Sequence, residues 1–456
     1  MEWLSLLLFA LIFIALLIGF PVAITLAGVS LLFALFANAI GAFDIAFLQS
    51  IPSRIFSIMS NQTLIAVPLF VFMGIMLEKS KIAENLLQTM DESMRGIKGG
   101  LGIAVIIVGA LLAASTGIVG ATVVTMGLLA LPTMLKQGYC PKLASGTICA
   151  AGTLGQIIPP SIILILLGDV LSSSYQQAQL NQGIFSPETL SVGDLFVAAL
   201  LPGMLLVVLY MLYLFYQAMR HPEKVPNHLG TPVAPGLSKR ILKSLVPPLS
   251  LILLVLGSIL GGFATPTEAA SLGALGAMIL ALINRQLTLS ILQEVLQNTL
   301  KVTSMIFLIF IGAAFFSLVF RGLGGDDLMH DLLSDLPGGL FTAMLIVMIL
   351  LFILGFFLDF IEITYIVIPV VAPILLMMGV DPIWLGIMIA INLQTSFLTP
   401  PFGFALFYLR GVAPPDLKTA DLYRGVVPFI GIQLFVLALL AFWPELATWL
   451  PNVIYG

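Results

Sequence analysis

The chain has 456 residues, of which 60% are hydrophobic and only 9% are charged, and its mean hydropathy is +1.15. Because soluble domains carry about 25% charged residues, this composition excludes a soluble globular protein and indicates at most about a dozen membrane spans of about 20 residues each. The formal net charge is only -4 and there is no long basic run, which excludes a nucleic-acid-binding protein.

Long apolar segments recur along the whole chain. The first, residues 4–37, follows a start without basic residues, and we expect a retained membrane segment rather than a cleaved signal peptide. The others are residues 55–77, 101–114, 118–135, 144–171, 195–216, 245–262, 268–283, 302–320, 340–358, 361–378, 383–410 and 425–450. These segments exceed the roughly 10 residues of a membrane β-strand. We therefore predict an all-α polytopic membrane protein.

A polar stretch at residues 217–244 divides the chain into two hydrophobic halves, residues 1–216 and 245–456. Cytoplasmic loops are enriched in Lys and Arg, so we predict that this linker is cytoplasmic. Its charged residues are Arg220, Lys224, Lys239, Arg240 and Lys243 against Glu223. The loop at 172–194, which lacks Lys and Arg, and the aspartate-rich loop after Arg321 are predicted to face outward.

The two halves repeat one pattern. Pro159-Pro160 and Pro400-Pro401 lie 241 positions apart, and the same offset takes Gly355 to the polar interruption at residues 115–117. Each half is predicted to contain a hairpin with a polar tip, residues 101–135 or 340–378, followed by a helix broken at the Pro-Pro pair, residues 144–171 or 383–410. A single such pair favours a simple kink, whereas its repetition is typical of secondary transporters built from inverted-topology repeats.

Several motifs now identify a family resemblance. Residues 113–132, 138–139, 151–161, 264–270 and 398–403 together resemble the large membrane (M) subunit of tripartite ATP-independent periplasmic (TRAP) transporters. The resemblance implies an elevator-type, sodium-driven importer of organic anions, usually carboxylates, in a bacterial or archaeal inner membrane. It also implies two partners besides the lipid bilayer: a small membrane (Q) subunit, here expected as a separate polypeptide, and a periplasmic substrate-binding protein.

The resemblance further implies two sodium sites, each between a hairpin tip and the neighbouring helix break, formed mostly by backbone carbonyls. The first comprises Ser115, Thr116, Gly155, Ile158 and Ser161, and the second comprises Gly355, Ser396, Thr399 and Phe402. Ser396 departs from the glycine that other members often have there. Candidates for lining the anion site between the tips are Thr122, Gln156, Asp359, Glu362 and Gln394. The resemblance implies sodium as the coupling ion and no organic cofactor.

Two pairs of polar residues have both a structural and a functional interpretation. Thr265 and Glu268 have the spacing of a helix capping box, which we favour over direct substrate contact. Asp359 and Glu362 share a helix face in an apolar stretch, where carboxylates are costly. They either line the functional site or hold the hairpin tip by hydrogen bonds to its backbone, and both interpretations stay open.

Two single charges border the broken helices. Asp169 follows the first break, and a solvated anchor is favoured over an ion ligand. Arg410 is its counterpart in the second half. Snorkelling to the membrane interface is favoured there over clamping a carboxylate.

The residues also argue against an enzyme. The histidines all fall in predicted loops, so His-dependent chemistry within the membrane lacks its residues; they are His221, His228 and His330. No G-x-x-x-x-G-K-[ST] loop indicates an ATP-driven pump. The alternative that remains is a stand-alone sodium/anion symporter of related hairpin architecture, which would differ in needing no binding protein.

Overall fold

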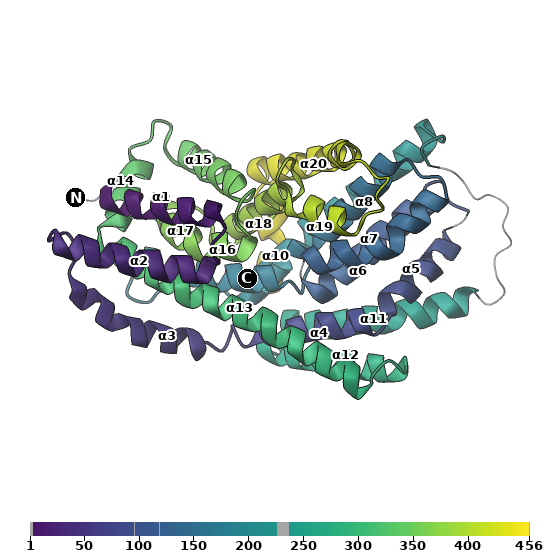
Figure 1. Ribbon diagram of the computed structural model, residues 1–456, viewed down its shortest axis with the longest axis horizontal. Coiled ribbons are helices and arrows are strands. Elements are labelled where there is room, and N and C mark those ends of the chain that lie inside the picture. Colours follow the sequence, from purple (N-terminus) through teal and green to yellow (C-terminus); the bar gives the residue numbers. More distant parts are fainter. Residues whose placement is uncertain (1–2, 95, 118, 226–236, 456) are drawn as a thin grey trace.

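The computed structural model describes residues 3–94, 96–117, 119–225 and 237–455, and every α-helix in these ranges is labelled below as in Figure 1. The first half contains α1 (Trp3–Ile18), α2 (Val22–Ala39), α3 (Ile51–Met59), α4 (Ala66–Lys79), α5 (Ile82–Ser93), α6 (Gly100–Thr116), α7 (Val119–Lys136), α8 (Pro141–Thr153), α9 (Ile162–Asn181) and α10 (Val192–Arg220). The second contains α11 (Leu237–Leu260), α12 (Pro266–Ile283), α13 (Leu289–Gly322), α14 (Gly325–Ser334), α15 (Gly339–Leu354), α16 (Phe360–Ile366), α17 (Ile368–Met377), α18 (Pro382–Leu398), α19 (Phe404–Val412), α20 (Thr419–Phe442) and α21 (Glu445–Tyr455).

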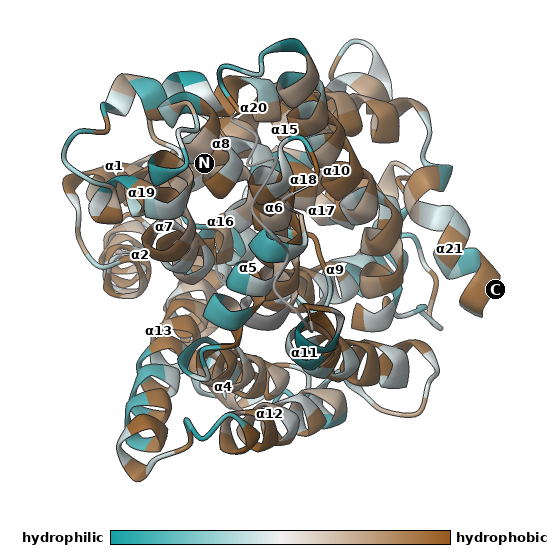
Figure 2. Ribbon diagram, turned by 90° about the vertical axis from the view of Figure 1, so that its right-hand side faces the viewer, coloured by the Kyte–Doolittle hydropathy of each residue, from teal (hydrophilic) through white to brown (hydrophobic). Residues whose placement is uncertain are grey.

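Among the described residues, seven helices are long and apolar enough to cross a membrane: α2, α7, α10, α11, α12, α13 and α20. The pair α16 and α17, bent by 57°, counts as an eighth if it forms one span. The helices are coloured mostly as hydrophobic in Figure 2, and many of their large apolar side chains are exposed, such as Leu275 at 60% and Leu282 at 61% on α12. Exposed apolar surface of this extent is what contact with lipid requires. The predicted all-α polytopic membrane fold is confirmed.

Several predicted segments are split where glycine or proline ends a helix. The segment 4–37 forms α1 and α2 rather than one helix, because Gly19 adopts a left-handed φ of +97° and Pro21 caps the next helix. Likewise, the segment 425–450 divides between α20 and α21 at Pro444. A residue before proline is disfavoured in the helical region, which ends α20 there.

Helices α4, α11, α12 and α13 form a layer along one side of the molecule. α12 packs against α4 and α11, while α13 packs against α2 and α4. The same four helices lie along the lower edge in the two perpendicular views of Figures 1 and 2. The larger body above them contains α6 to α9 and α15 to α20, and it holds both predicted hairpins and both predicted helix breaks.

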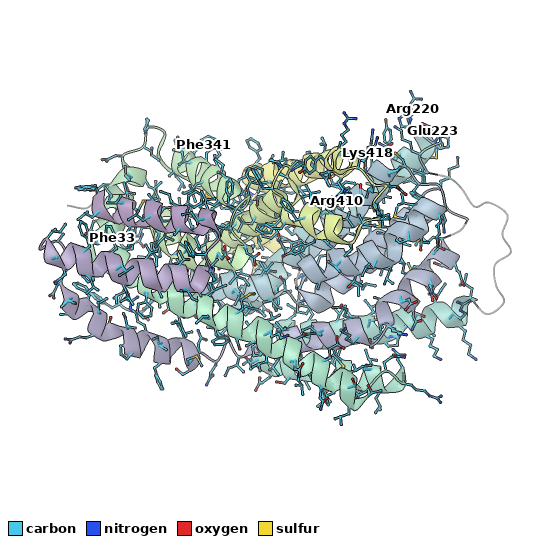
Figure 3. All side chains as sticks on the ribbon, viewed as in Figure 1. Phe33, Arg220, Glu223, Phe341, Arg410 and Lys418 are labelled. Carbon is cyan, nitrogen blue, oxygen red and sulfur yellow. The ribbon has the colours of Figure 1, made fainter. Side chains whose placement is uncertain are left out.

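The predicted polar linker lies at one end of the long axis. α10 extends to Arg220 and α11 begins at Leu237, while residues 226–236 of the linker lie outside the described part of the chain. Arg220, Glu223 and Lys418 lie toward the right-hand end in Figure 3, and Phe33 and Phe341 lie in the left-hand half. The charged residues at the end of α10 and the start of α20 therefore lie toward one end of the long axis.

The capping box predicted at Thr265 and Glu268 is confirmed at the start of α12. The Thr265 backbone N–H donates to Glu268 Oε2 at 2.8 Å, and the Glu268 N–H donates to Thr265 Oγ1 at 3.3 Å. Both groups are exposed, so the pair ends a helix rather than lining a buried site.

Thr265→Ala should therefore shift the folding equilibrium by about fivefold toward the unfolded state, because an N-terminal N–H loses its acceptor. Thermal unfolding of the detergent-solubilised chain measures this effect, and Thr265→Ser, which keeps the hydroxyl, should match the wild type. Loss of substrate binding in Thr265→Ala without a change in unfolding would contradict the structural role.

Candidate functional site

The two predicted hairpins approach each other from opposite ends of the molecule. The first consists of α6 and α7, and its tip contains Gly117, whose φ of +60° ends α6. The second consists of α15 followed by α16 and α17, and its tip runs from Gly355 to Asp359. Figure 1 shows α6 and α7 in the right-hand half and α15 to α17 in the left-hand half. A cavity of about 160 Å³ is lined by residues of both tips, including Gly117, Gly120, Asp359 and Phe360.

Each Pro-Pro pair lies in a break between two helices. In the first half, α8 ends at Thr153, a short 3-10 turn covers Leu154–Gln156, and α9 begins after Ser161. In the second half, α18 ends at Leu398 and α19 begins at Phe404. The Pro159-Pro160 and Pro400-Pro401 peptide bonds are both cis. Residues 151–157 and 391–398 are buried, so the chain just before each break lies inside the protein body.

The first predicted sodium site gathers oxygen atoms around Ser161. The Ser161 hydroxyl donates to the carbonyls of Gly155 at 3.0 Å and Gln156 at 3.2 Å. A Cβ placed on Gly155 would lie 3.4 Å from Ala113 in α6, so the break packs directly against the first hairpin. Ile158 lies in the same turn, where its N–H donates to the Leu154 carbonyl at 2.9 Å.

Ser115 and Thr116 belong to the last turn of α6, a helix that packs against the 3-10 turn of this break, but their side chains lie outside the described part of the chain. Gly117, the next residue, approaches the start of α9: a Cβ there would lie 3.0 Å from the backbone nitrogen of Ile162. The backbone at the tip of the first hairpin is thus brought to the first break.

The second predicted sodium site joins the second tip to the second break. A Cβ placed on Gly355 would overlap Ser396 Oγ and lie 3.0 Å from Ser396 Cβ. The Thr399 N–H donates to the Ser396 carbonyl at 3.0 Å, and the Thr399 hydroxyl donates to the Thr395 carbonyl at 2.7 Å. Phe402 is 43% exposed and its ring centroid lies 5.2 Å from that of Phe357 in the tip.

Of the five predicted lining residues, Gln156 and Asp359 line the cavity between the tips. Thr122, Glu362 and Gln394 are not among its described lining residues. Thr122 and Gln394 are instead buried within α7 and α18.

Sequence reasoning missed three contributions to the cavity wall. These come from α13, through Val302, Met305 and Ile306, and from Phe397 and Tyr408 beside the second break. Tyr408 lies against the first hairpin, since a Cβ on Gly120 would come within 2.9 Å of its ring. Aromatic and apolar residues at helical spacing carry no local signal that separates a cavity wall from ordinary packing, so no sequence pattern pointed to them.

Two glutamine side chains are buried without hydrogen-bond partners among the described residues. Gln156 and Gln394 are both 0% exposed, and both atoms of each amide lack a partner in the described part of the chain. Burying a polar group without a partner costs about 1–3 kcal/mol. Two such groups beside the breaks are costly to folding and suited to a polar ligand, and Gln156 faces the cavity.

Asp359 and Glu362 form a capping box at the start of α16. Asp359 Oδ1 accepts from the Phe360 N–H at 2.7 Å, and Glu362 Oε2 accepts from the Asp359 N–H at 3.0 Å. These bonds establish the structural interpretation for both carboxylates. Asp359 also lines the cavity between the tips.

The two charges bordering the breaks have protein partners. Asn61 Nδ2 donates to Asp169 Oδ1 at 2.8 Å, and the Tyr365 hydroxyl lies 3.5 Å from Asp169 Oδ2. Asp169 thus connects α9 with α16 and with the segment before α4, rather than serving as the solvated anchor that the sequence favoured. Arg410 is exposed and donates to the Leu417 carbonyl.

Comparisons with known proteins cover nearly the whole chain. The family model described as the DctM component of the tripartite ATP-independent periplasmic transporter matches residues 9–446. The chain is 28% identical over 99% of its length to the C4-dicarboxylate TRAP transporter large permease protein DctM of Vibrio cholerae, covering 98% of that protein. It is 27% identical to the sialic acid TRAP transporter large permease protein SiaM of the same organism, covering 96% of each chain.

A solved structure also resembles the fold. The YdaH transporter of Alcanivorax borkumensis matches with a TM-score of 0.58 at 14% identity, over 89% of this chain and 88% of that one. At this identity the likeness concerns the arrangement of helices alone.

Proposed function

This chain belongs to the family of the DctM component of TRAP transporters, and on that premise we propose that it is the large permease subunit of a sodium-coupled importer of organic anions. Members of this family are transporter permeases and not enzymes. The relatives named for C4-dicarboxylates and sialic acid both take carboxylates. A carboxylate is accordingly the substrate class proposed here.

The observation that carries the proposal is the cavity between the two hairpin tips. It is lined by Ile162 and Ile163, at the first turn of the 20-residue helix α9. The first N–H groups of a helix lack intrahelical acceptors, and the helix dipole adds positive potential there. Together with the unpartnered Gln156 amide, whose N–H₂ group can donate, this supports binding of an anionic carboxylate.

The break residues suit sodium as the coupling ion. Hard cations are bound by oxygen ligands, and carbonyl and hydroxyl oxygens are the groups that converge at both predicted sites. In the first, these are the carbonyls of Gly155 and Gln156 with the hydroxyl of Ser161. In the second, the Thr399 hydroxyl donates to the Thr395 carbonyl, and the Ser396 carbonyl accepts from the Thr399 N–H. Sodium bound at either break would fix the adjacent tip and so raise the affinity for the anion, a coupling that is reciprocal.

The arrangement of hairpins also supports an elevator motion. The two hairpins and breaks would form the moving part, with inverted topology in the two halves, while the layer of α4, α11, α12 and α13 belongs to the scaffold. The proposal includes a small membrane (Q) subunit and a periplasmic binding protein as partners, as the word tripartite in the family's description implies. It places the assembly in the inner membrane of its cell.

Uptake into proteoliposomes tests this function. Vesicles containing the chain and its small subunit receive labelled carboxylate with or without an inward sodium gradient, and with or without the cognate binding protein. Uptake that needs both supports the proposal. Sodium-driven uptake of free substrate without the binding protein would instead establish a stand-alone symporter, and flux that is indifferent to sodium would contradict both proposed ion sites.

A further inference from the structure

A second cavity, of about 390 Å³, lies far from the hairpin tips, between α5, α11 and the end of α12. Its polar lining comes from three helices: Asn85, Gln88 and Thr89 of α5, Arg240, Lys243 and Ser244 of α11, and Asn284, which caps α12. We propose that this cavity binds the headgroup of an anionic phospholipid, with the phosphodiester on Lys243 and the hydroxyls of a glycerol headgroup on the surrounding amides.

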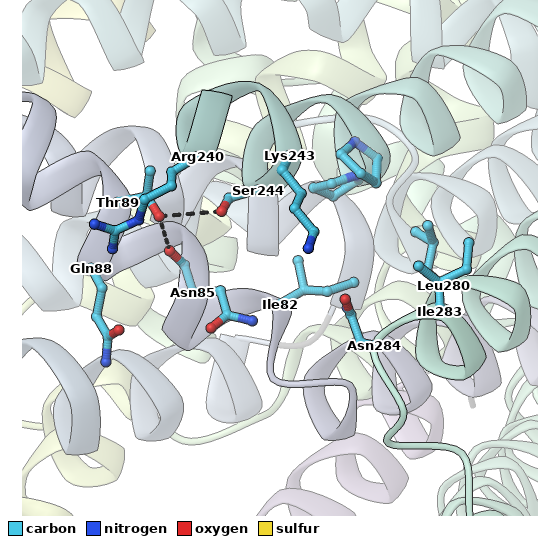
Figure 4. Close-up of a pocket in the computed structure, with 12 residues that line it drawn as sticks. Ile82, Asn85, Gln88, Thr89, Arg240, Lys243, Ser244, Leu280, Ile283 and Asn284 are labelled. Carbon is cyan, nitrogen blue, oxygen red and sulfur yellow. Dashed lines mark hydrogen bonds between the residues drawn. The ribbon is translucent and has the colours of Figure 1, made fainter. Parts of the chain in front are cut away.

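Lys243 supplies the charge for this site. Figure 4 shows its side chain reaching from α11 into the space between Asn85 and Asn284. Among the described residues, Lys243 has no ion-pair partner, whereas Arg240 is paired with Glu92, with Nη1 and Oε2 2.8 Å apart. The ammonium group of Lys243 is therefore available to an external anion, and Arg240 is held at the rim by its own carboxylate partner.

The cavity lies at the level where a lipid headgroup would be found. Both α11 and α12 are long and apolar enough to span a membrane, and the cavity is formed at the polar end of each. Basic pockets between spans on the cytoplasmic side are suited to phospholipid headgroups. The α11 end carries Lys239, Arg240 and Lys243, the basic bias that the positive-inside rule assigns to the cytoplasm.

The apolar part of the lining favours a lipid over a free phosphate ion. Pro247, Leu280 and Ile283 line the same cavity. Pro247 and Leu280 lie one helical turn farther into their spans than Lys243 and Asn284, and Ile283 directly precedes Asn284. Ile283 is 66% exposed, so we infer that this wall opens sideways toward the bilayer. An inorganic anion would leave this apolar wall in water, whereas the acyl chains of a phospholipid would cover it.

The polar chemistry selects among phospholipids. Side-chain amides donate and accept hydrogen bonds, which suits the hydroxyl groups of phosphatidylglycerol. The ammonium group of phosphatidylethanolamine would instead lie close to Lys243 and Arg240, where like charges repel. We therefore expect phosphatidylglycerol to bind more tightly than zwitterionic lipids.

Native mass spectrometry of the full chain in detergent, titrated with phosphatidylglycerol or phosphatidylcholine, tests this site. Lys243→Gln should weaken phosphatidylglycerol binding by about fivefold, the effect expected for one basic residue at a membrane surface. Lys239→Gln is the matched control, because Lys239 is exposed on the same helix, does not line the cavity and carries the same charge. It should bind phosphatidylglycerol as the wild type does, with unchanged phosphatidylcholine retention in both variants.

Three results would overturn the proposal. The first is an equal loss of phosphatidylglycerol binding in Lys243→Gln and Lys239→Gln, and the second is equal retention of phosphatidylglycerol and phosphatidylcholine by the wild type. The third is displacement of the lipid by inorganic phosphate at equal concentration, which would indicate a site for soluble anions. If Lys243→Gln fails to fold, Asn284→Ala, at the end of another helix, tests the same cavity. It should weaken phosphatidylglycerol binding a few-fold through the loss of one hydrogen-bonding group, and unchanged binding there would equally contradict the site.

Discussion

Gly355→Ala is expected to raise the sodium concentration for half-maximal uptake by about fivefold to a hundredfold. The added methyl group would overlap Ser396 Oγ and lie 3.0 Å from Ser396 Cβ, so the second hairpin tip would be pushed away from the second break. Overpacking of this kind costs about 1–3 kcal/mol, and every 1.4 kcal/mol is about a tenfold change in an equilibrium constant. Sodium titration of uptake in proteoliposomes measures the effect.

Two further variants separate this contact from a general effect of alanine. Gly431→Ala is the control, because a Cβ on this α20 glycine meets nothing within 4 Å, and it should leave the sodium titration unchanged. The double variant Gly355→Ala with Ser396→Gly removes the colliding atoms and should recover most of the sodium affinity, since the proposed ligand at residue 396 is a carbonyl. No recovery, with both proteins folded, would remove Gly355 and Ser396 from the proposed site.

The elements around the site were predictable because their signals are local. Each Pro-Pro pair removes backbone donors within a few residues, and both breaks occur where the sequence indicates them. Gly117 ends α6 through a left-handed φ that few other residues adopt. Gly19 likewise has a left-handed φ and Pro21 caps the next helix, so the first apolar segment divides into α1 and α2. The sequence prediction did not treat residues 19–21 as the end of a helix.

The walls of the site depend instead on contacts between distant segments. Tyr408 reaches the cavity because α19 packs on α7, and Met305 does so because α13 packs on α16. Asp169 is placed by Asn61, 108 positions earlier, and by Tyr365, 196 positions later. The residues next to Asp169 in the sequence do not carry that information, which explains why Asp169 could be interpreted as a solvated anchor.

Gln156→Leu is expected to stabilise the protein while abolishing most of its transport. Both polar atoms of the buried Gln156 amide lack a hydrogen-bond partner among the described residues, so replacing it with an apolar side chain of similar size should raise the free energy of unfolding by about 1 kcal/mol or more. If the amide binds the carboxylate between the tips, the same change removes a hydrogen bond to a charged group. A loss of about 1.5–3 kcal/mol then lowers substrate affinity by about tenfold or more.

The opposite signs of these two effects distinguish a binding residue from a structural one, and Gln179→Leu provides the matched comparison. Gln179 is also buried, but its amide is satisfied: Nε2 donates to the Glu188 carbonyl at 3.0 Å and Oε1 accepts from the Glu188 N–H at 2.9 Å. Its replacement should lower the unfolding midpoint and leave substrate affinity per folded molecule unchanged. Thermal unfolding and uptake measured on the same preparations distinguish the two roles. A Gln156→Leu protein that is destabilised yet binds substrate normally would mean that the Gln156 amide has a structural role and does not contact the anion.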